Sequence, residues 1–118
     1  MNINRFNRVS FQFMKGTYIT DAAYSFAFTN GGSFKIGRTK DETIGTMYAV
    51  DFTGQVTAAS ETDWVEISIP ISAFKNIGID PTVVTGFAVI VNRTNGSAPA
   101  DNDEDSIYMD DFILYLNP

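Results

Sequence analysis

The sequence predicts an all-β protein, folded as one antiparallel β-sandwich of about eight strands over residues 1–118. Three observations lead to this prediction. The chain holds ten Phe, five Tyr and one Trp, and these residues, with Val, Ile and Thr, favour strands. No window shows a sustained helical period of apolar residues. Turn residues also interrupt the chain at short intervals, which is typical of a sandwich or barrel. A length of 118 residues suits a single domain.

The first half of the chain contains four predicted strands. In residues 6–15, Val9, Phe11 and Phe13 alternate with polar residues, so one face of this strand is expected in the core and the other in solvent. Residues 24–28 and 33–38 form the next two strands, and Asn30-Gly31-Gly32 forms a hairpin turn between them because Asn and Gly tolerate positive φ. A fourth strand is expected at 47–52.

Three further strands follow. In residues 63–70, one face carries Val65, Ile67 and Ile69, and the other carries Trp64, Glu66 and Ser68. A single helical turn is expected at 71–76. Residues 85–92 are apolar on both faces, which predicts a central strand. A polar loop at 94–105 then leads to the closing strand, 106–116.

Two residue types are missing, and their absence excludes several kinds of chemistry. The chain has no Cys, so disulfides, thiolate metal sites and a Cys nucleophile are excluded. It has no His either, which excludes Ser-His-Asp catalysis and His-based zinc sites. No apolar run reaches the ~20 residues that span a bilayer, so no membrane association is expected.

Charge is distributed unevenly along the chain. The net charge is −6, and all eight Lys and Arg lie at or before Arg93, together with eight acids. The last 25 residues carry six acids and no base. Nucleic acid requires a basic face, so it is not an expected partner. A block of acids suits a hard cation such as calcium, although a solvated acidic loop would look the same.

Two stretches of the second half resemble a known family. Residues 62–74 read Thr-Asp-Trp-Val-Glu-Ile-Ser-Ile-Pro-Ile-Ser-Ala-Phe, and residues 106–116 read Ser-Ile-Tyr-Met-Asp-Asp-Phe-Ile-Leu-Tyr-Leu. In order and spacing they resemble the jelly-roll carbohydrate-binding modules that are attached to plant-polysaccharide hydrolases. The resemblance implies a jelly-roll form of the sandwich and a structural calcium ion bound by an Asp of the last strand. Modules of this kind usually have a further strand or two before the position of Phe6, and residues there often complete the calcium site.

The last strand supplies the expected metal ligands, Asp110 and Asp111. In a regular strand neighbouring residues point to opposite faces, so one of the two carboxylates should face the core. A buried carboxylate needs a partner, which would be calcium or an Arg such as Arg5 or Arg8. The spacing Asp101-x-Asp103-x-Asp105 resembles the start of an EF-hand, but Ser106 and Phe112 stand where that loop needs Gly and Glu.

A sugar-binding face combines exposed aromatic rings with polar side chains. Four polar residues are expected on the outward faces of strands: Gln12, Lys35, Glu66 and Asn92. Trp64 shares the face of Glu66, where it is either a sugar platform or a packing residue. Tyr48 lies near a strand start and is a second candidate for stacking.

The sequence is thus interpreted as a non-catalytic carbohydrate-binding module. The resemblance implies plant cell-wall polysaccharide as the ligand, with soluble β-glucan chains such as xyloglucan or cello-oligosaccharides as the expected form. The resemblance further implies a secreted or extracellular protein with a covalently attached glycoside hydrolase. An alternative is a structural or protein-interaction domain of a surface or phage assembly. A third possibility is a carboxylate enzyme that uses Glu66 and Asp51, but nothing in the sequence marks these two as a pair.

Overall fold

The computed structural model describes residues 1–16, 22–31, 46–93 and 108–116. Six strands make up most of this part of the chain. They are β1 (Phe6–Met14), β2 (Ala22–Asn30), β3 (Thr46–Asp51), β4 (Val65–Pro70), β5 (Val84–Arg93) and β6 (Tyr108–Leu116). One short α-helix, α1 (Ile71–Asn76), and two 3-10 helices, η1 (Thr53–Gln55) and η2 (Ala58–Glu61), lie between strands.

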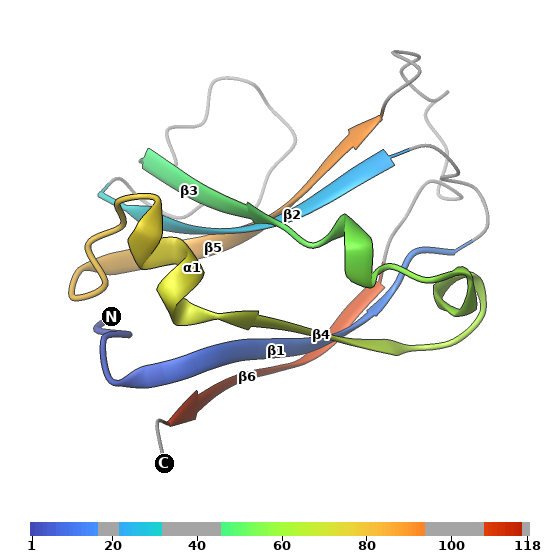
Figure 1. Cartoon of the computed structure of the whole chain (residues 1–118), viewed down its shortest axis with the longest axis horizontal. Coiled ribbons are helices and arrows are strands. Elements are labelled where there is room, and N and C mark those ends of the chain that lie inside the picture. The colour runs from blue at the N-terminus through green and yellow to red at the C-terminus, as the bar shows by residue number, and fades with distance from the viewer. Residues whose placement is uncertain (17–21, 32–45, 94–107, 117–118) are drawn as a thin grey trace.

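The strands form two antiparallel sheets that face each other (Figure 1), with the orders β4-β1-β6 and β3-β2-β5. Of the consecutive strands, only β2 and β3 share a sheet. The predicted all-β antiparallel sandwich is confirmed, with six strands in the described part of the chain rather than eight. The predicted strand 33–38 and the loop 94–105 lie outside the described residues. The predicted helical turn at 71–76 is confirmed as α1.

One prediction about strand order is wrong among the described strands. Residues 85–92 were expected to form a central strand, but β5 pairs with β2 alone and lies at the edge of its sheet, while β2 is central. Within residues 87–91 the apolar side chains on both faces of β5 are half-buried. Apolar character on two faces is therefore not enough to predict a central position in the sheet.

The core lies between the sheets and is largely aromatic. The alternation in β1 buries Val9, Phe11 and Phe13 completely, as predicted. Phe11 stacks on Phe26 of β2 across the sandwich, with ring centroids 5.3 Å apart. Burying one such side chain contributes ~2–3 kcal/mol of hydrophobic free energy, so these strands provide much of the driving force for folding.

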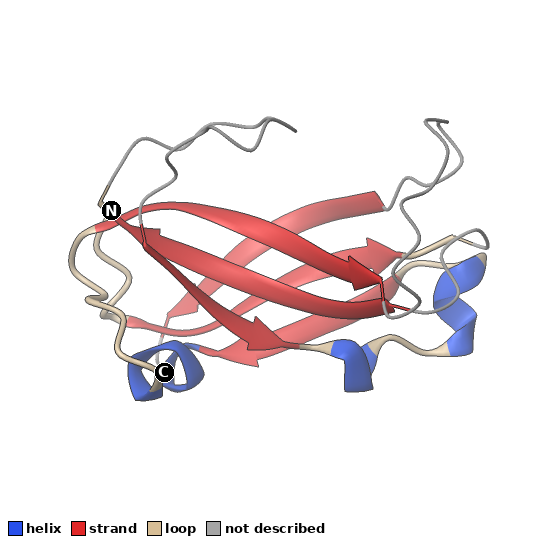
Figure 2. Ribbon diagram, turned by 90° about the horizontal axis from the view of Figure 1, so that it is seen from above, coloured by secondary structure: helices blue, strands red, loops and turns tan. Residues whose placement is uncertain are grey.

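The two sides of the sandwich differ in how completely the inward-facing side chains are buried. Figure 2 shows the helical segments gathered along one side, where Ile71 and Phe74 of α1 are buried against the core. On the other side, where β5 and β6 lie, the inward-facing side chains are only partly buried. There Phe87 and Phe112 stack at 4.7 Å between centroids and join the two sheets.

Candidate binding face

The outer face of the sheet β4-β1-β6 carries most of the predicted site residues that the structure describes. The core side of β1 is occupied by Phe11 and its neighbours, so Gln12 points outward. In the register of the sheet, Gln12 lies opposite Glu66 on β4 and Asp110 on β6. Three strands thus place an amide and two carboxylates side by side on one outward-facing surface.

A β-bulge in β6 determines how the acidic pair is presented. Ser10 pairs with Ile113 and Gln12 pairs with Asp110, so two residues of β6 lie opposite Phe11 alone. Asp111 adopts the left-handed conformation, with φ of 53°, which is the backbone of a G1-type bulge. The bulge shifts the alternation by one residue for the part of β6 that follows.

Because of this bulge, the prediction that one carboxylate of the acidic pair faces the core is wrong. A regular strand would turn one of the two carboxylates toward the core, but Asp110 and Asp111 are both exposed. Phe112 takes the inward place instead, and its ring stacks on Phe26 with centroids 5.7 Å apart. The Asp110 carboxylate accepts a hydrogen bond from the Asp111 N–H at 2.8 Å. Because neither carboxylate is buried, neither requires calcium or an Arg partner for solvation.

The acidic pair borders an open hollow of about 220 Å³ on this face, together with Gln12 and Trp64. The indole of Trp64 is 46% exposed. The hollow therefore offers an accessible aromatic ring, an amide that donates and accepts, and two acceptor carboxylates. This combination suits a ligand that has both apolar C–H surface and hydroxyl groups.

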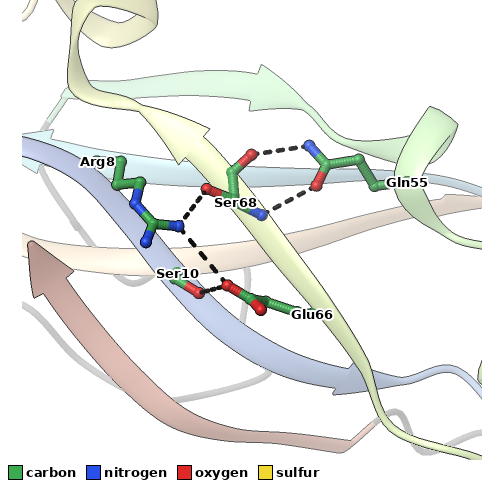
Figure 3. A network of polar contacts seen from close by, with 5 residues as sticks. All are labelled: Arg8, Ser10, Gln55, Glu66 and Ser68. Carbon is green, nitrogen blue, oxygen red and sulfur yellow. Dashed lines mark hydrogen bonds and ion pairs between the residues drawn. The ribbon is translucent and has the colours of Figure 1, made fainter.

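A polar network lies farther along the same face (Figure 3). Arg8 donates from Nη1 to Ser68 Oγ at 3.1 Å and lies 3.6 Å from Glu66 Oε1. The same Glu66 oxygen accepts a hydrogen bond from Ser10 Oγ at 3.0 Å. On the other side of Arg8, its guanidinium carbon lies 3.9 Å from the centroid of the Tyr115 ring. The guanidinium is thus held on two sides, in a cation–π contact and in an ion pair.

The remaining predicted site residues do not join this face. Tyr48 pairs with Phe28 on the inward face of the other sheet and packs partly buried against the core. Asn92 is exposed, but it lies opposite Ala23 on the outer face of that same sheet. Lys35 falls outside the described residues. Asp51, the alternative catalytic partner of Glu66, lies on β3 opposite Ser25, so the two carboxylates are on opposite outer faces of the sandwich.

Sequence reasoning did not identify Arg8, Ser10 and Tyr115 as site residues. The alternation of β1 does place Arg8 and Ser10 outward with Gln12. However, Glu66 is distant in sequence from Arg8, and only the pairing of β1 with β4 and β6 brings Glu66 and Tyr115 to it. No sequence pattern within a single strand indicates such a contact.

The donor set of the hollow is compatible with calcium in chemical type. Calcium prefers carboxylate and amide oxygens, which Asp110, Asp111 and Gln12 supply, and takes six to eight oxygens in all. Water would have to supply most of the other ligands. No cluster of three or more His, Cys, Asp or Glu suited to a metal is present among the described residues.

No protein-family model, curated protein or solved structure matches this chain. Within the described ranges, none of the helices has the length and apolar character to cross a membrane.

Proposed function

We propose that this domain binds polysaccharide without modifying it, and that the outer face of β4-β1-β6 is the binding surface. The observation that carries the proposal is the half-exposed Trp64 indole at a hollow shared with Gln12 and the Asp110–Asp111 pair. A pyranose ring can stack its C–H face on the indole while its hydroxyls bond to the amide and carboxylates.

The shape of the hollow favours a chain over a small enclosed ligand. It is open and lies on an exposed sheet face, so it does not enclose a ligand, and a longer chain could extend beyond it. A crystalline surface would require several coplanar aromatic rings, whereas the chain has one Trp. Together with the family resemblance, this favours soluble β-glucans of the plant cell wall, such as xyloglucan, as the proposed ligands. In this proposal the domain is secreted and targets a covalently attached glycoside hydrolase to them.

The calcium ion implied by the family resemblance is proposed as a structural cofactor at Asp110 and Asp111. Its support is the oxygen-rich hollow and the absence of any basic residue after Arg93. When bound, the ion would neutralise the two carboxylates, and Gln12, which lines the same hollow, could add an amide oxygen.

A second function is favoured by a different observation. Three large apolar side chains of β6 are exposed, namely Tyr108 at 49%, Ile113 at 44% and Leu116 at 56%. Exposed apolar side chains on an edge strand also suit contact with another protein, as in a structural domain of a surface or phage assembly.

The test is calorimetric titration of the domain with a panel of soluble β-glucans. Trp64→Ala and Gln12→Ala are expected to weaken binding about tenfold each. Ile77→Ala is the matched control, because Ile77 is 47% exposed and lies next to α1. Loss of binding in Asn92→Ala with normal binding in Trp64→Ala would place the site on the other sheet. No binding to any glycan would refute the proposal and favour the protein-interaction function.

A further inference from the structure

The Asn30 side chain, at the end of β2, is bonded to the loop that leads into β5. Its Oδ1 accepts a hydrogen bond from the Asp80 N–H at 2.8 Å. Its Nδ2 donates to the Asp80 carbonyl at 2.9 Å and to the Val83 carbonyl at 3.4 Å. These three hydrogen bonds make up the Asn30 clip. They require both halves of the amide, because the oxygen acts as an acceptor and the NH₂ group as a donor.

The residue that follows Asn30 makes this amide chemically reactive. Gly31 is exposed and has no side chain to hinder the approach of its backbone nitrogen to the Asn30 Cγ. When the two atoms bond, the C–N bond of the Asn30 amide breaks, and the NH₂ group leaves as ammonia with the Gly31 amide proton. The product is a cyclic succinimide. Water then adds to one of its two carbonyls and opens the ring, which leaves an aspartyl or an isoaspartyl residue at position 30.

The folded structure opposes this reaction. Asn30 is paired within its sheet on both sides, with Thr46 of β3 and Val84 of β5. Its amide is held in the clip, so ring closure requires the side chain to break its three hydrogen bonds and turn toward Gly31. The reaction therefore needs a local opening of this end of the sandwich, in which these hydrogen bonds are broken.

Either product prevents the clip from forming again. An aspartyl carboxylate has no N–H at neutral pH, so the Asp80 and Val83 carbonyls would face a negative charge where the NH₂ group now donates. An isoaspartyl residue adds one carbon to the backbone at the point where β2 pairs with both of its neighbours. Val84, one of the paired residues, is buried in the core. Both products are therefore expected to destabilise the domain.

We propose that Asn30-Gly31 is a deamidation site, that the Asn30 clip protects it in the folded domain, and that reaction there weakens the fold irreversibly. Each opening of this end of the sandwich then carries a chance of permanent chemical change, and the folded population declines with time. The inference concerns the stability and lifetime of the domain and is independent of its ligand.

The test compares deamidation of the wild-type domain at mildly alkaline pH in its folded state and in guanidinium chloride. Tryptic peptide mapping by mass spectrometry measures the reaction, and Asn30 is the only Asn or Gln in the expected peptide 16–35. We expect the folded domain to react at least about tenfold more slowly, because three hydrogen bonds must break first. Equal rates in the two conditions, or no reaction in guanidinium chloride, would overturn the proposal.

Asp80→Ala loosens the clip without changing the reacting residues. It removes the carboxylate that accepts hydrogen bonds from the Thr82 hydroxyl and N–H and so shapes the loop. Deamidation of Asn30 in this variant should be faster than in the wild type in the folded state and equal in guanidinium chloride. Asp51→Ala is the matched control, since it removes a similar carboxylate bond, from the Thr53 N–H, away from the clip, and it should react as wild type.

Asn30→Asp measures the effect of the aspartyl product directly. It should unfold at a lower guanidinium chloride concentration than the wild type, whereas Asn92→Asp, which adds the same charge at an exposed position of β5, should not. If Asn30→Asp does not fold, partly deamidated wild-type protein gives the same comparison, and its deamidated fraction should unfold first. Wild-type stability in Asn30→Asp, or an unchanged folded-state rate in Asp80→Ala, would overturn the proposal.

Discussion

The side chain of Gln55 pairs with the backbone of Ser68 as a neighbouring strand would. Its Nε2 donates to the Ser68 carbonyl and its Oε1 accepts from the Ser68 N–H, both at 2.9 Å (Figure 3). Ser68 lies on β4, an edge strand of its sheet. An exposed edge strand can pair with a strand of another chain, and Gln55 occupies the middle of the β4 edge.

Gln55→Ala is therefore expected to lower the free energy of unfolding by about 1–2 kcal/mol and to increase self-association. Gln55→Glu keeps the acceptor oxygen and loses the N–H donor. Its free energy of unfolding should therefore lie between those of the wild type and Gln55→Ala. Urea denaturation and sedimentation velocity measure these effects. Wild-type stability in Gln55→Ala would show that water replaces the amide without loss.

Asp111 is the only non-glycine residue with positive φ in the described part of the chain. Gly adopts this conformation without strain, whereas a Cβ costs about 1 kcal/mol there. We expect Asp111→Gly to be more stable than Asp111→Ala by about this amount, as measured by urea denaturation. Asp110→Gly and Asp110→Ala serve as the control pair, because Asp110 has ordinary strand backbone, where Gly should be the less stable variant. The same order of stability at both positions would mean that the bulge is not maintained in solution.

Calcium binding at Asp110 can be tested without sugar. On protein stripped of metal, calcium is expected to raise the melting temperature by several degrees, because a ligand that binds only the folded state stabilises it. Chelator should reverse the shift, and Asp110→Ala should abolish it. Magnesium at the same concentration controls for non-specific screening of the acidic residues. Identical melting curves with calcium and with chelator would rule out a structural ion.

The pKa of Asp80 offers a test of loop structure before β5. The Thr82 hydroxyl donates to Asp80 Oδ1 at 2.6 Å and the Thr82 N–H donates at 3.0 Å. These two bonds, the hydroxyl first, lower the pKa of Asp80 from its ordinary value of 3.8, against a weaker opposing effect of desolvation. Because the folded-state pKa is the lower one, this contribution to stability is present above the unfolded pKa and is lost as pH falls through the folded pKa.

Thr82→Val removes the hydroxyl hydrogen bond, which is the larger of the two effects that lower the pKa of Asp80. The Asp80 titration midpoint should therefore move back toward 3.8. Carbon-detected NMR of the carboxyl group between neutral pH and strongly acidic pH measures it. Thr85→Val is a suitable control, since the Thr85 hydroxyl bonds to Thr29 and not to Asp80. An unchanged midpoint in Thr82→Val would show that the hydroxyl bond is absent in solution.

The alternation of apolar and polar residues was enough to predict which residues of the regular strands face the core. The alternation of Val9, Phe11 and Phe13 and that of Ile67 and Ile69 predicted the buried faces, and the structure confirms them. The same alternation placed Gln12 and Glu66 outward. This works because side-chain direction in a strand has a period of two that depends only on local backbone geometry.

The folded arrangement of the two sheets determines which strands are neighbours and where the alternation of side chains is interrupted. The Arg8–Glu66–Tyr115 arrangement requires the pairing of β1 with β4 and β6, and many pairings are compatible with the same local patterns. The bulge at Asp111 depends on the register between β1 and β6, and it exposes both carboxylates where a regular strand would bury one. Local sequence fixes the direction of a side chain relative to its own strand, but its neighbours across the sheet depend on long-range packing, which has no local signal.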